Sequence, residues 1–577
     1  MIESPHHARV GWVGLITSSA VLAALTAAVA LHAAPALALP PCTVAGLSAL
    51  GVPAVTVASA VDVPASPANP EYCDVRGTVT TTGYGAPSGL AQFEVQLPAT
   101  WSGRFLFFGV GGTAGSTYAD FAGNPVDYFQ ALFKGYATAI TDTGHQAGNT
   151  DAAWAITAPH VADSAKVADY YFRATHQVTL AGKALAQKYY GAGSIRRAYF
   201  DGCSNGGRQA MVEATHFPED YDGVIAGAPF MDIRAIIQGA KQEKAMLLSA
   251  DSYIPYTLLP LIDKAVYASC DAADGVKDGL IQNPAKCAFD PASMVCASPS
   301  ATGCLTPNQA RTLRSYTSAL RSEEGRLIYP GASVTDLAGG MDAWTTGFVP
   351  PSDFAAAEPW GGTGFSPAPA VWQFTDHIIK YLVERDPGFN VRSFPESPGG
   401  FIGEGALSLF DARTEAGDGD RPEHLLPFIY QNRKLLMYHG FSDPALPPFR
   451  TVKFYEDLAD ARGGYAELQE NVRLFMVPGM QHCGGGPGPN VFDTLTAMEK
   501  WSESGMAPDG LLATHSTSGT VDRSMPLCKF PEQARYDGKS NVNVASSWSC
   551  TSNKGLLELG PDGVRAGLGG DGHEGDE

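Results

Sequence analysis

The chain has 577 residues, of which 45% are hydrophobic, and its 59 acidic and 39 basic side chains give a formal net charge of -20. This composition is that of a globular protein with a sizeable core and excludes a disordered chain, and the length accommodates one large domain with an insertion. An acidic chain repels phosphate groups and anionic lipids, so the charge argues against nucleic acid as a partner.

The first 38 residues have the features of a secretory signal peptide. Arg9 precedes an apolar run from Val10 to about Leu31, and Ala36-Leu37-Ala38 is a small-residue cleavage site. A membrane anchor is the alternative, because the run is nearly long enough to span a bilayer, but Pro35 and the cleavage site favour removal. No other stretch approaches spanning length, so we expect a secreted or periplasmic protein that makes no membrane contact after cleavage.

The cysteines agree with export. There are ten, an even number, and cysteines of exported proteins are usually paired. No Cys-x-x-Cys occurs, so the spacing does not support a zinc site.

The chain between residues 43 and 112 is strand-rich. Residues 92–97 alternate between polar and apolar side chains, and Arg104–Phe108 is a short apolar run. That run ends in Gly109-Val110-Gly111-Gly112. A glycine cluster after a core strand can supply a backbone N–H to an oxyanion, and a plain turn is the alternative of equal weight.

Strands and helices then alternate. Residues 137–144 read as a strand and its turn, residues 163–190 as a helix that ends at Gly191, and residues 195–200 as a strand before a second helix. A buried strand at residues 223–228 ends at Pro229. This alternation predicts a mostly parallel sheet covered by helices.

The character of the chain changes between residues 231 and 424, where glycine, proline and aromatic residues increase and strand signals fade. We predict an inserted lid domain there, so that residues 39–230 and 425–559 form the catalytic domain. The sheet pattern resumes with strands at Lys434–Gly440 and Val472–Val477 around a helix at Phe449–Arg462. Residues 560–577 are acidic and glycine-rich and are predicted to be a disordered tail.

Three segments carry the residues of a catalytic triad. Ser204 lies in Gly202-Cys203-Ser204-Asn205-Gly206, the Gly-x-Ser-x-Gly frame of an α/β-hydrolase nucleophile elbow. Asp443 and His482 each follow a predicted core strand, and the order Ser, Asp, His is the one that this fold requires. His482 is expected to take the Ser204 proton, with Asp443 orienting the imidazole. His439 is the competitor, but it lies within its strand and is expected to pack.

Two further patterns bear on the site. If Ser204 and His482 meet, the adjacent Cys203 and Cys483 are close enough to form a disulfide; two free core cysteines are the alternative. Asp271, Asp274 and Asp278 stand on a glycine-broken loop. Oxygen ligands on a tight loop suit Ca²⁺, and a solvated acidic loop explains the same residues equally well.

With these motifs in view, the chain resembles the tannase and feruloyl esterase family of secreted serine esterases, which also includes mono(2-hydroxyethyl) terephthalate hydrolases. The resemblance covers nearly all of the mature chain. It is carried by Gly202-Cys203-Ser204-Asn205-Gly206-Gly207-Arg208, by Asp443 in Gly-Phe-Ser-Asp-Pro, and by His482-Cys483-Gly484-Gly485-Gly486. It implies an α/β-hydrolase fold with a large inserted lid domain.

The resemblance also implies specific site residues. A structural calcium in the lid would be held by Asp271, Asp274 and Asp278 with the carbonyls of Val276 and Leu280, and no organic cofactor is expected. The oxyanion donors would be the N–H groups of Asn205 and Gly112. The implied disulfides are Cys42–Cys73, Cys203–Cys483, Cys270–Cys287, Cys296–Cys304 and Cys528–Cys550.

The leading hypothesis is therefore an esterase that cleaves feruloyl, hydroxycinnamoyl or galloyl esters through an acyl-enzyme on Ser204. A terephthalate-monoester hydrolase of the same family, an inert hydrolase-fold binding protein, and a peptidase or lipase are the alternatives. A terephthalate monoester carries a free carboxylate, which arginine recognises best. Residues 327–384 contain many aromatic side chains and no arginine, which favours a neutral ring, although Arg234 or Arg392 could reach the site.

Overall fold

The computed structural model describes residues 39–552 apart from 192, 194, 299–300, 362–366 and 398. The predicted signal peptide and acidic tail lie outside the described residues. A nine-stranded sheet forms the centre of the fold, in the order β1-β2-β3-β5-β4-β8-β9-β13-β14. Its strands are β1 (Val55–Val63), β2 (Tyr72–Thr81), β3 (Gly89–Pro98), β4 (Arg104–Phe108), β5 (Tyr136–Thr141), β8 (Arg197–Cys203), β9 (Gly223–Gly227), β13 (Lys434–Gly440) and β14 (Val472–Val477).

The sheet is antiparallel at its start and parallel thereafter. Strands β1, β2, β3 and β5 pair antiparallel, whereas β5, β4, β8, β9, β13 and β14 pair parallel. The predicted mostly parallel sheet is thus confirmed for the part that carries the Ser204, Asp443 and His482 loops. Parallel strands bring these loops to one edge, because each follows the carboxyl end of its strand.

Side chains alternate between two hydrophobic clusters, one on each face of the sheet. In β4, Phe105 and Phe107 belong to one cluster and Leu106 and Phe108 to the other. The first face is covered by α4 (Ala174–Tyr190), α5 (Asn205–His216), α11 (Pro422–Tyr430) and α12 (Phe449–Arg462). The second face packs against α2 (Pro125–Phe133) and α14 (Thr494–Ser504). Burial on both faces explains why these strands read as continuous apolar runs.

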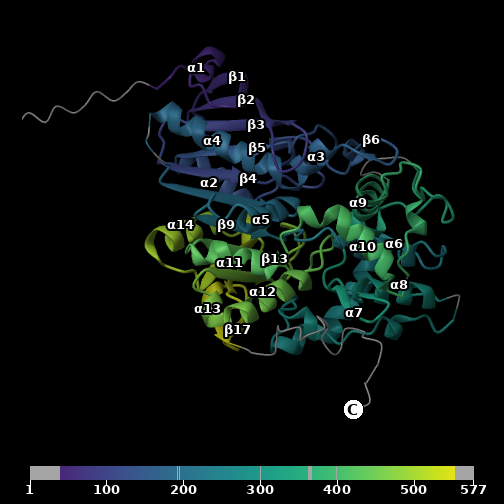
Figure 1. Cartoon of the computed structure of the whole chain (residues 1–577). Helices are drawn as coiled ribbons and strands as arrows, with labels where there is room; N and C mark the ends of the chain where they lie inside the picture. The colour runs from purple at the N-terminus through teal and green to yellow at the C-terminus, as the bar shows by residue number, and fades with distance from the viewer. Residues whose placement is uncertain are drawn as a thin grey trace, which may run out of the picture. The chain divides into compact units, whose positions relative to one another are not determined.

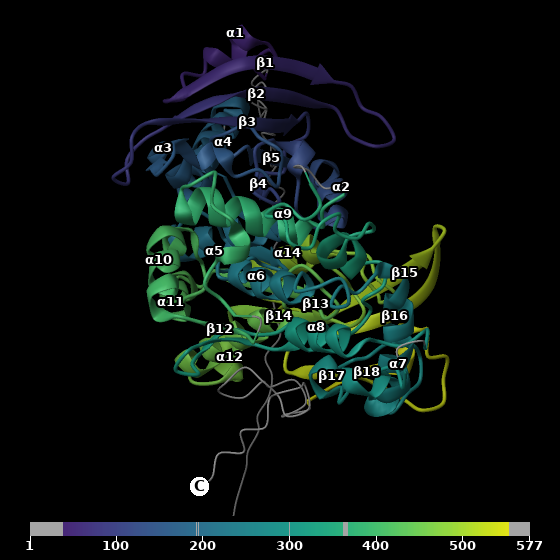
Figure 2. The same cartoon turned by 90° about the vertical axis from the view of Figure 1, so that its right-hand side faces the viewer.

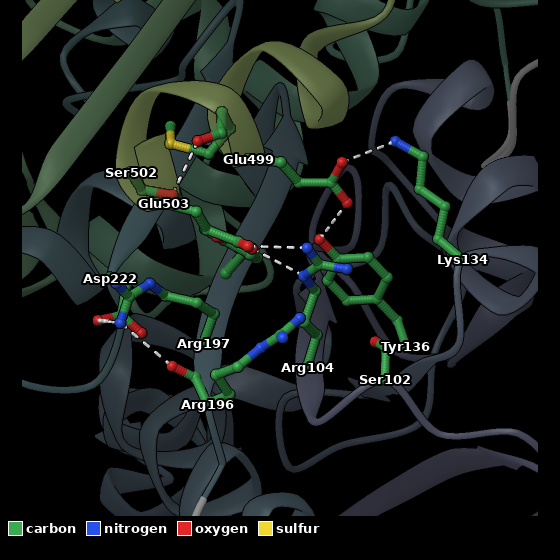
Figure 3. A network of polar contacts seen from close by, with 12 residues as sticks. Ser102, Arg104, Lys134, Tyr136, Arg196, Arg197, Asp222, Glu499, Ser502 and Glu503 are labelled. Carbon is green, nitrogen blue, oxygen red and sulfur yellow. Dashed lines mark hydrogen bonds and ion pairs between the residues drawn. The ribbon is translucent and has the colours of Figure 1, made fainter. Parts of the chain in front are cut away.

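Helix α14 is fixed to the amino ends of β4 and β5 by ion pairs and a hydrogen bond (Figure 3). The Arg104 guanidinium at the start of β4 donates to both carboxylate oxygens of Glu503, at 2.7 and 2.8 Å. The hydroxyl of Tyr136 at the start of β5 donates to Glu499 at 2.7 Å, and Lys134 pairs with the same carboxylate. This network lies at the edge of the sheet opposite the Ser204 loop and serves the fold.

Residues 231–424, called the insertion below, add no strand to the nine-stranded sheet in their described part. Figure 1 shows their helices gathered at one side of the sheet. They are α6 (Ala235–Met246), α7 (Leu259–Cys270), α8 (Pro307–Thr317), α9 (Ala370–His377) and α10 (Glu404–Thr414), with a small sheet of β10 (Leu320–Ser322), β11 (Leu327–Tyr329) and β12 (Phe401–Ile402). Ile236 and Ile378 share a cluster with Leu436 of β13, so the insertion packs directly on the central core.

Shorter elements complete the described chain. Two hairpins lie near its end, and Figure 2 shows the longer one, β15–β16. These strands are β15 (Gly510–Thr517), β16 (Thr520–Cys528), β17 (Glu532–Tyr536) and β18 (Trp548–Ser552). The others are α1 (Val44–Ser48), β6 (Ile156–Ala158), β7 (Val161–Ala162), α3 (Ser164–Ala168) and α13 (Tyr465–Leu468).

None of the described helices is both long and apolar enough to cross a bilayer.

The helix predicted at residues 163–190 is interrupted. Asp163 caps α3, a π-helical turn follows at Asp169–Arg173, and α4 ends at Tyr190, next to the predicted break at Gly191, which is left-handed. Asp169 and Arg173 form a 2.6 Å ion pair with both side chains fully buried. The wider turn therefore holds a buried charge pair that helical periodicity does not reveal.

Candidate active site

Ser204 lies on the sharp turn between β8 and α5. Its backbone has φ 62° and ψ -126°, a conformation that L-residues rarely adopt and that is typical of strained functional turns. The flanking glycines are required, because a Cβ atom on Gly202 would lie 2.2 Å from the carbonyl oxygen of Gly206. The Gly-x-Ser-x-Gly frame thus forms the strand-turn-helix that the sequence predicted.

Asp443 and His482 are joined by a hydrogen bond. His482 Nδ1 lies 2.7 Å from Asp443 Oδ2, which leaves Nε2 of the same ring for another partner. The backbone N–H groups of Ala445 and Leu446 donate to Asp443 Oδ1 at 2.8 and 2.9 Å. The Trp344 ring packs on His482 with ring centroids 4.7 Å apart. The carboxylate and the imidazole are therefore both held in place.

A second histidine contacts the same carboxylate. His439, in β13, approaches Asp443 Oδ2 at 3.1 Å and the Leu446 carbonyl at 3.2 Å, both through Nε2. Both partners are acceptors, so Nε2 carries the proton, and Nδ1 accepts from the Thr451 hydroxyl at 2.7 Å. The expectation that His439 only packs misses this contact.

The environment of Asp443 keeps it ionised. Burial alone would raise the pKa of this carboxyl group, but the charge of His482 and the hydrogen bonds from His439 and His482 outweigh burial and hold the pKa well below its usual range. An ionised Asp443 can stabilise an imidazolium on His482.

The Ser204 and His482 loops are tied together covalently. A disulfide joins Cys203 to Cys483 with Cα atoms 5.9 Å apart, as expected from their positions next to the serine and the histidine. Within the described ranges, Ser204 and His482 line one pocket without a hydrogen bond between them. Such contacts commonly tighten only when substrate binds.

Two backbone N–H groups belong to residues that line the pocket with Ser204. Those of Gly112 and Asn205 find no acceptor in the part of the chain that the structure describes, although Gly111 and Thr113 beside Gly112 both donate within the protein. Asn205 begins α5, where N–H groups are free and the helix dipole favours negative charge. The Asn205 side chain donates to the Val110 carbonyl at 2.9 Å, which links the two segments.

The pocket above Ser204 is mostly apolar and has a volume of about 590 Å³ including its mouth. No Asp, Glu, Lys or Arg of the described chain lines it. Its walls combine the Ser204 and His482 loops with α6 and α9 of the insertion, through Gly112, Ser204, Asn205, Phe230, Ala235, Ile236, Gln238, Gly239, Gln242, Val371, Phe374, Thr375, Ile378, Ala445, Leu446, Pro447 and His482. Such a surface suits an uncharged hydrophobic group.

A sequence model described as "Tannase and feruloyl esterase" matches residues 73–551. The chain belongs to this family. Among its relatives, the mono(2-hydroxyethyl) terephthalate hydrolase of Piscinibacter sakaiensis is 31% identical over 533 residues, which are 84% of this chain and 85% of the relative. Feruloyl esterase B of Aspergillus niger is 29% identical over 486 residues, 79% of this chain and 83% of the relative.

Solved structures of other esterases and hydrolases share the fold. Feruloyl esterase B from Aspergillus oryzae aligns with a TM-score of 0.73 and 25% identity over 87% of this chain and 97% of its own. The tannin acyl hydrolase from Aspergillus niger aligns with a TM-score of 0.67 and 22% identity over 89% of this chain and 97% of its own. The chain is therefore a carboxylic ester hydrolase with an α/β-hydrolase-like fold, as the family resemblance implied.

The arginines that could have reached a substrate carboxylate are engaged elsewhere. Arg234 makes a two-pronged ion pair with Asp411, at 2.8 and 2.7 Å. Arg392 donates to the carbonyls of Ala356 and Leu247 at 3.0 and 3.1 Å. Both contacts hold the insertion together.

The aromatic residues of the insertion divide between its core and the site. Trp360 and Trp372 are core residues, and Phe348 is exposed. Phe374 lines the pocket and Trp344 packs on His482. Phe365, another aromatic residue of the segment 327–384, lies outside the described residues.

The predicted calcium loop is closed by its own side chains. Asp271 accepts from the N–H groups of Asp278 and Gly279, Asp274 from that of Val276, and Asp278 from that of Leu280. Arg523 of β16 donates to the Asp278 carbonyl at 2.6 Å.

The same loop holds a buried oxygen that a cation would satisfy. Asp274 Oδ2 has no hydrogen-bond partner among the described residues. Burial raises the pKa of Asp274 to about 6. The nearby Asp278 charge also raises this pKa, and the hydrogen bond from Val276 lowers it. The three carboxylates do not all lie within 4.8 Å of one another, so the loop would have to contract around an ion. The donor set fits calcium, and the site stays a prediction.

All ten cysteines are paired as the resemblance implied. Besides Cys203–Cys483, the disulfides are Cys42–Cys73, Cys270–Cys287, Cys296–Cys304 and Cys528–Cys550. Disulfides of this number are typical of proteins that fold in an oxidising compartment.

Proposed function

We propose that this family member is a secreted serine esterase that hydrolyses esters of neutral aromatic acids through an acyl-enzyme on Ser204. The observation that carries the proposal is the Asp443–His482 hydrogen bond beside Ser204, in a pocket lined by apolar and uncharged side chains. A hydrogen-bonded acid and base next to a serine that lines the pocket are the parts that nucleophilic acyl transfer needs.

In this mechanism, His482 Nε2 takes the Ser204 proton as Oγ attacks the ester carbonyl carbon. Asp443 holds the Nδ1–H tautomer and stabilises the imidazolium. The N–H groups of Asn205 and Gly112 would bind the oxyanion. His482 then protonates the departing alcohol, and water, activated by the same imidazole, releases the aromatic acid and restores Ser204.

The insertion is proposed to act as a lid that forms the acid side of the pocket, because α6 and α9 supply much of the wall. In that case α6 and α9 set which acid fits. Calcium, if bound at Asp271, Asp274 and Asp278, would hold the charged loop together and supply no group to the reaction. The five disulfides and the predicted signal peptide support export.

Burst kinetics test the serine mechanism. With a 4-nitrophenyl ester of a benzoic acid, the wild-type protein should release one nitrophenol per active site in a burst before steady turnover. Ser204→Ala should give no burst. A folded wild-type protein that turns over no ester would instead favour the inert binding protein.

A substrate panel tests the charge preference. We expect higher kcat/KM for methyl hydroxycinnamates and neutral benzoates than for the terephthalate monoester, because a carboxylate would be buried without a cationic partner. The outcome that contradicts this is the charged monoester as the best substrate. It would mean that a side chain such as Arg234 leaves its partner to bind the acid.

A further inference from the structure

A histidine and two carboxyl groups meet where α4, the end of α5 and the loop after α5 come together. One potential ligand atom of each residue, His176, Glu213 and Asp220, lies within 4.8 Å of the other two. His176 belongs to α4, Glu213 to the last turn of α5, and Asp220 to the loop before β9. None of them lines the pocket above Ser204, so this cluster is separate from the active site.

The cluster contains a buried carboxyl group that no donor faces. Glu213 is 0% exposed, and neither of its side-chain oxygens has a hydrogen-bond partner among the described residues. Asp220 is itself an acceptor, and its Oδ2 lies 2.7 Å from His176 Nδ1. The His176 ring stacks on Phe217 with centroids 3.7 Å apart, which fixes its position. Because two ionised carboxylates at this range repel each other, either a cation or a proton must accompany them.

The protein supplies little positive charge of its own to this pair. The Lys183 ammonium donates to the Asp220 backbone carbonyl and lies 4.7 Å from the centre of the Tyr221 ring. No lysine or arginine within the described ranges forms an ion pair with the Asp220 or Glu213 carboxylate. Burial raises the pKa of Glu213 well above its usual range, the Asp220 charge raises it further, and Lys183 lowers it. The carboxyl-terminal end of α5 also favours a cation through its helix dipole.

The donor set decides which cation fits. An imidazole nitrogen with two carboxylate oxygens suits Zn²⁺, whereas Ca²⁺ takes oxygen ligands. Ligand atoms around a tetrahedral zinc are about 3.4 Å apart, so side-chain movements of about 1 Å would close the cluster around the ion. The His176 and Asp220 side chains are 13% and 11% exposed, which gives access to the ion and to water as a fourth ligand.

A second cluster of similar composition does not qualify. It contains Cys42, Asp62 and Cys73, and its two cysteines are joined in a disulfide, so their sulfur atoms are not available as thiolates. The absence of Cys-x-x-Cys argues against a zinc site made of thiolates, and the His176 cluster uses none.

We propose that His176, Glu213 and Asp220 form a zinc site that joins α4 to the end of α5. The ion neutralises the buried carboxylates and supplies no group to ester hydrolysis. Since α5 begins directly after Ser204, the ion would hold the far end of the helix that follows the nucleophile. This site is distinct from the predicted calcium loop and does not depend on the proposed esterase function.

Zinc titration of the whole protein tests the site. The protein is prepared without a histidine tag, treated with chelator, and returned to buffer with excess calcium so that the loop at residues 271–278 is saturated. Calorimetric titration with Zn²⁺ should then show one ion per chain with a Kd of about 1 μM or lower. The melting temperature should rise by several degrees, because the ion binds only the folded cluster.

Two variants remove a ligand without removing the shape of the side chain. Glu213→Gln should raise the zinc Kd at least about 100-fold, since even the outer partners of metal ligands contribute 10- to 100-fold. His176→Phe keeps a ring to stack on Phe217 and should have the same effect, so it serves if Glu213→Gln does not fold. His515→Phe is the matched control: His515 Nδ1 lies 2.6 Å from Asp522 Oδ1, but no third ligand joins this pair in the described chain. Its Kd should stay within about twofold of wild type.

The outcomes are clear-cut. No saturable zinc binding by the wild-type protein would overturn the proposal and would mean that a proton accompanies the two carboxylates. Binding that persists unchanged in Glu213→Gln and His176→Phe would overturn it too, because the ion would then lie elsewhere. Either result leaves the proposed esterase function intact, since ester turnover by Ser204 is measured separately.

Discussion

At the scale of single residues, the site depends on Ser204. Ser204→Ala should lower kcat by about 10⁴-fold or more, because the covalent route is lost while the pocket remains. Its melting temperature should change by no more than about 2 °C. Ser502→Ala, on α14 away from the pocket, is the control and should keep full activity. Residual Ser204→Ala activity within tenfold of wild type would refute the triad.

The contact between His439 and Asp443 leads to a prediction that the sequence alone did not allow. His439→Phe removes the N–H donated to Asp443, and hydrogen bonds to charged groups contribute about 1.5–3 kcal/mol, so kcat should fall roughly 10- to 100-fold with little change in KM. His439→Gln can still donate and should recover much of this loss. Equal kcat values for the two variants would show that His439 only fills space.

These residues show what sequence can find at this scale. Ser204, Asp443 and His482 stand in recognisable motifs whose chain order is fixed by the fold, so their meeting was predictable. His439 lies inside strand β13, and no motif surrounds it. Its role depends on the atoms that it contacts after folding, and only the structure shows these contacts.

At the scale of elements, β4, β13, β14 and α12 have the predicted bounds because buried strands and amphipathic helices follow simple patterns. The helix at residues 163–190 does not, since a π-helical turn that contains the buried Asp169–Arg173 pair interrupts it. Asp201, Gly202 and Cys203 also extend β8 beyond the predicted strand, up to the elbow itself. Tertiary contacts decide these details.

The buried pair in the π-helical turn should be costly to break. Asp169→Ala leaves the Arg173 guanidinium buried without its anion and should lower the free energy of unfolding by about 3–5 kcal/mol in urea titrations. The double variant Asp169→Leu with Arg173→Met removes both charges and should recover most of that loss. A double variant less stable than Asp169→Ala would show that the pair itself is stabilising.

The aspartate loop gives an independent prediction about calcium. Removing calcium with a chelator should lower the melting temperature by several degrees, and adding it back should restore it, because an ion bound only to the folded loop stabilises the fold. In Asp274→Ala, added calcium should have no such effect. Asp353→Ala is the control, because Asp353 accepts from the N–H two residues ahead, as Asp274 does. No calcium in protein purified without chelator would leave only a solvated loop.

At the scale of the whole molecule, the chain returns to its sheet after almost two hundred residues of insertion. Strand signals fade between residues 231 and 424, which predicts an insertion there, and the described part of these residues adds no strand to the nine-stranded sheet. The pocket wall could not be predicted in the same way. It is assembled from α6 and α9 on one side and the loops after β8, β13 and β14 on the other, and no periodicity relates these segments.

The Cys203–Cys483 disulfide joins the two halves of the sheet across the insertion, with a sequence separation of 280. Chain-entropy arguments assign a cross-link over such a loop about 5.5 kcal/mol, against about 2–3 kcal/mol for a short loop such as Cys296–Cys304, which spans 8 residues. The double variant Cys203→Ala with Cys483→Ala should therefore be less stable in urea titrations than the double variant Cys296→Ser with Cys304→Ser.

The same pair of variants separates stability from activity. Cys203 and Cys483 adjoin Ser204 and His482, so their loss should also lower kcat at least tenfold at a temperature where the variant is fully folded. The matched control Cys296→Ser with Cys304→Ser should keep its activity, because that disulfide lies within the insertion and none of its atoms lines the pocket. If both double variants lost stability alike and kept full activity, the disulfide would serve the fold and would not position the catalytic loops.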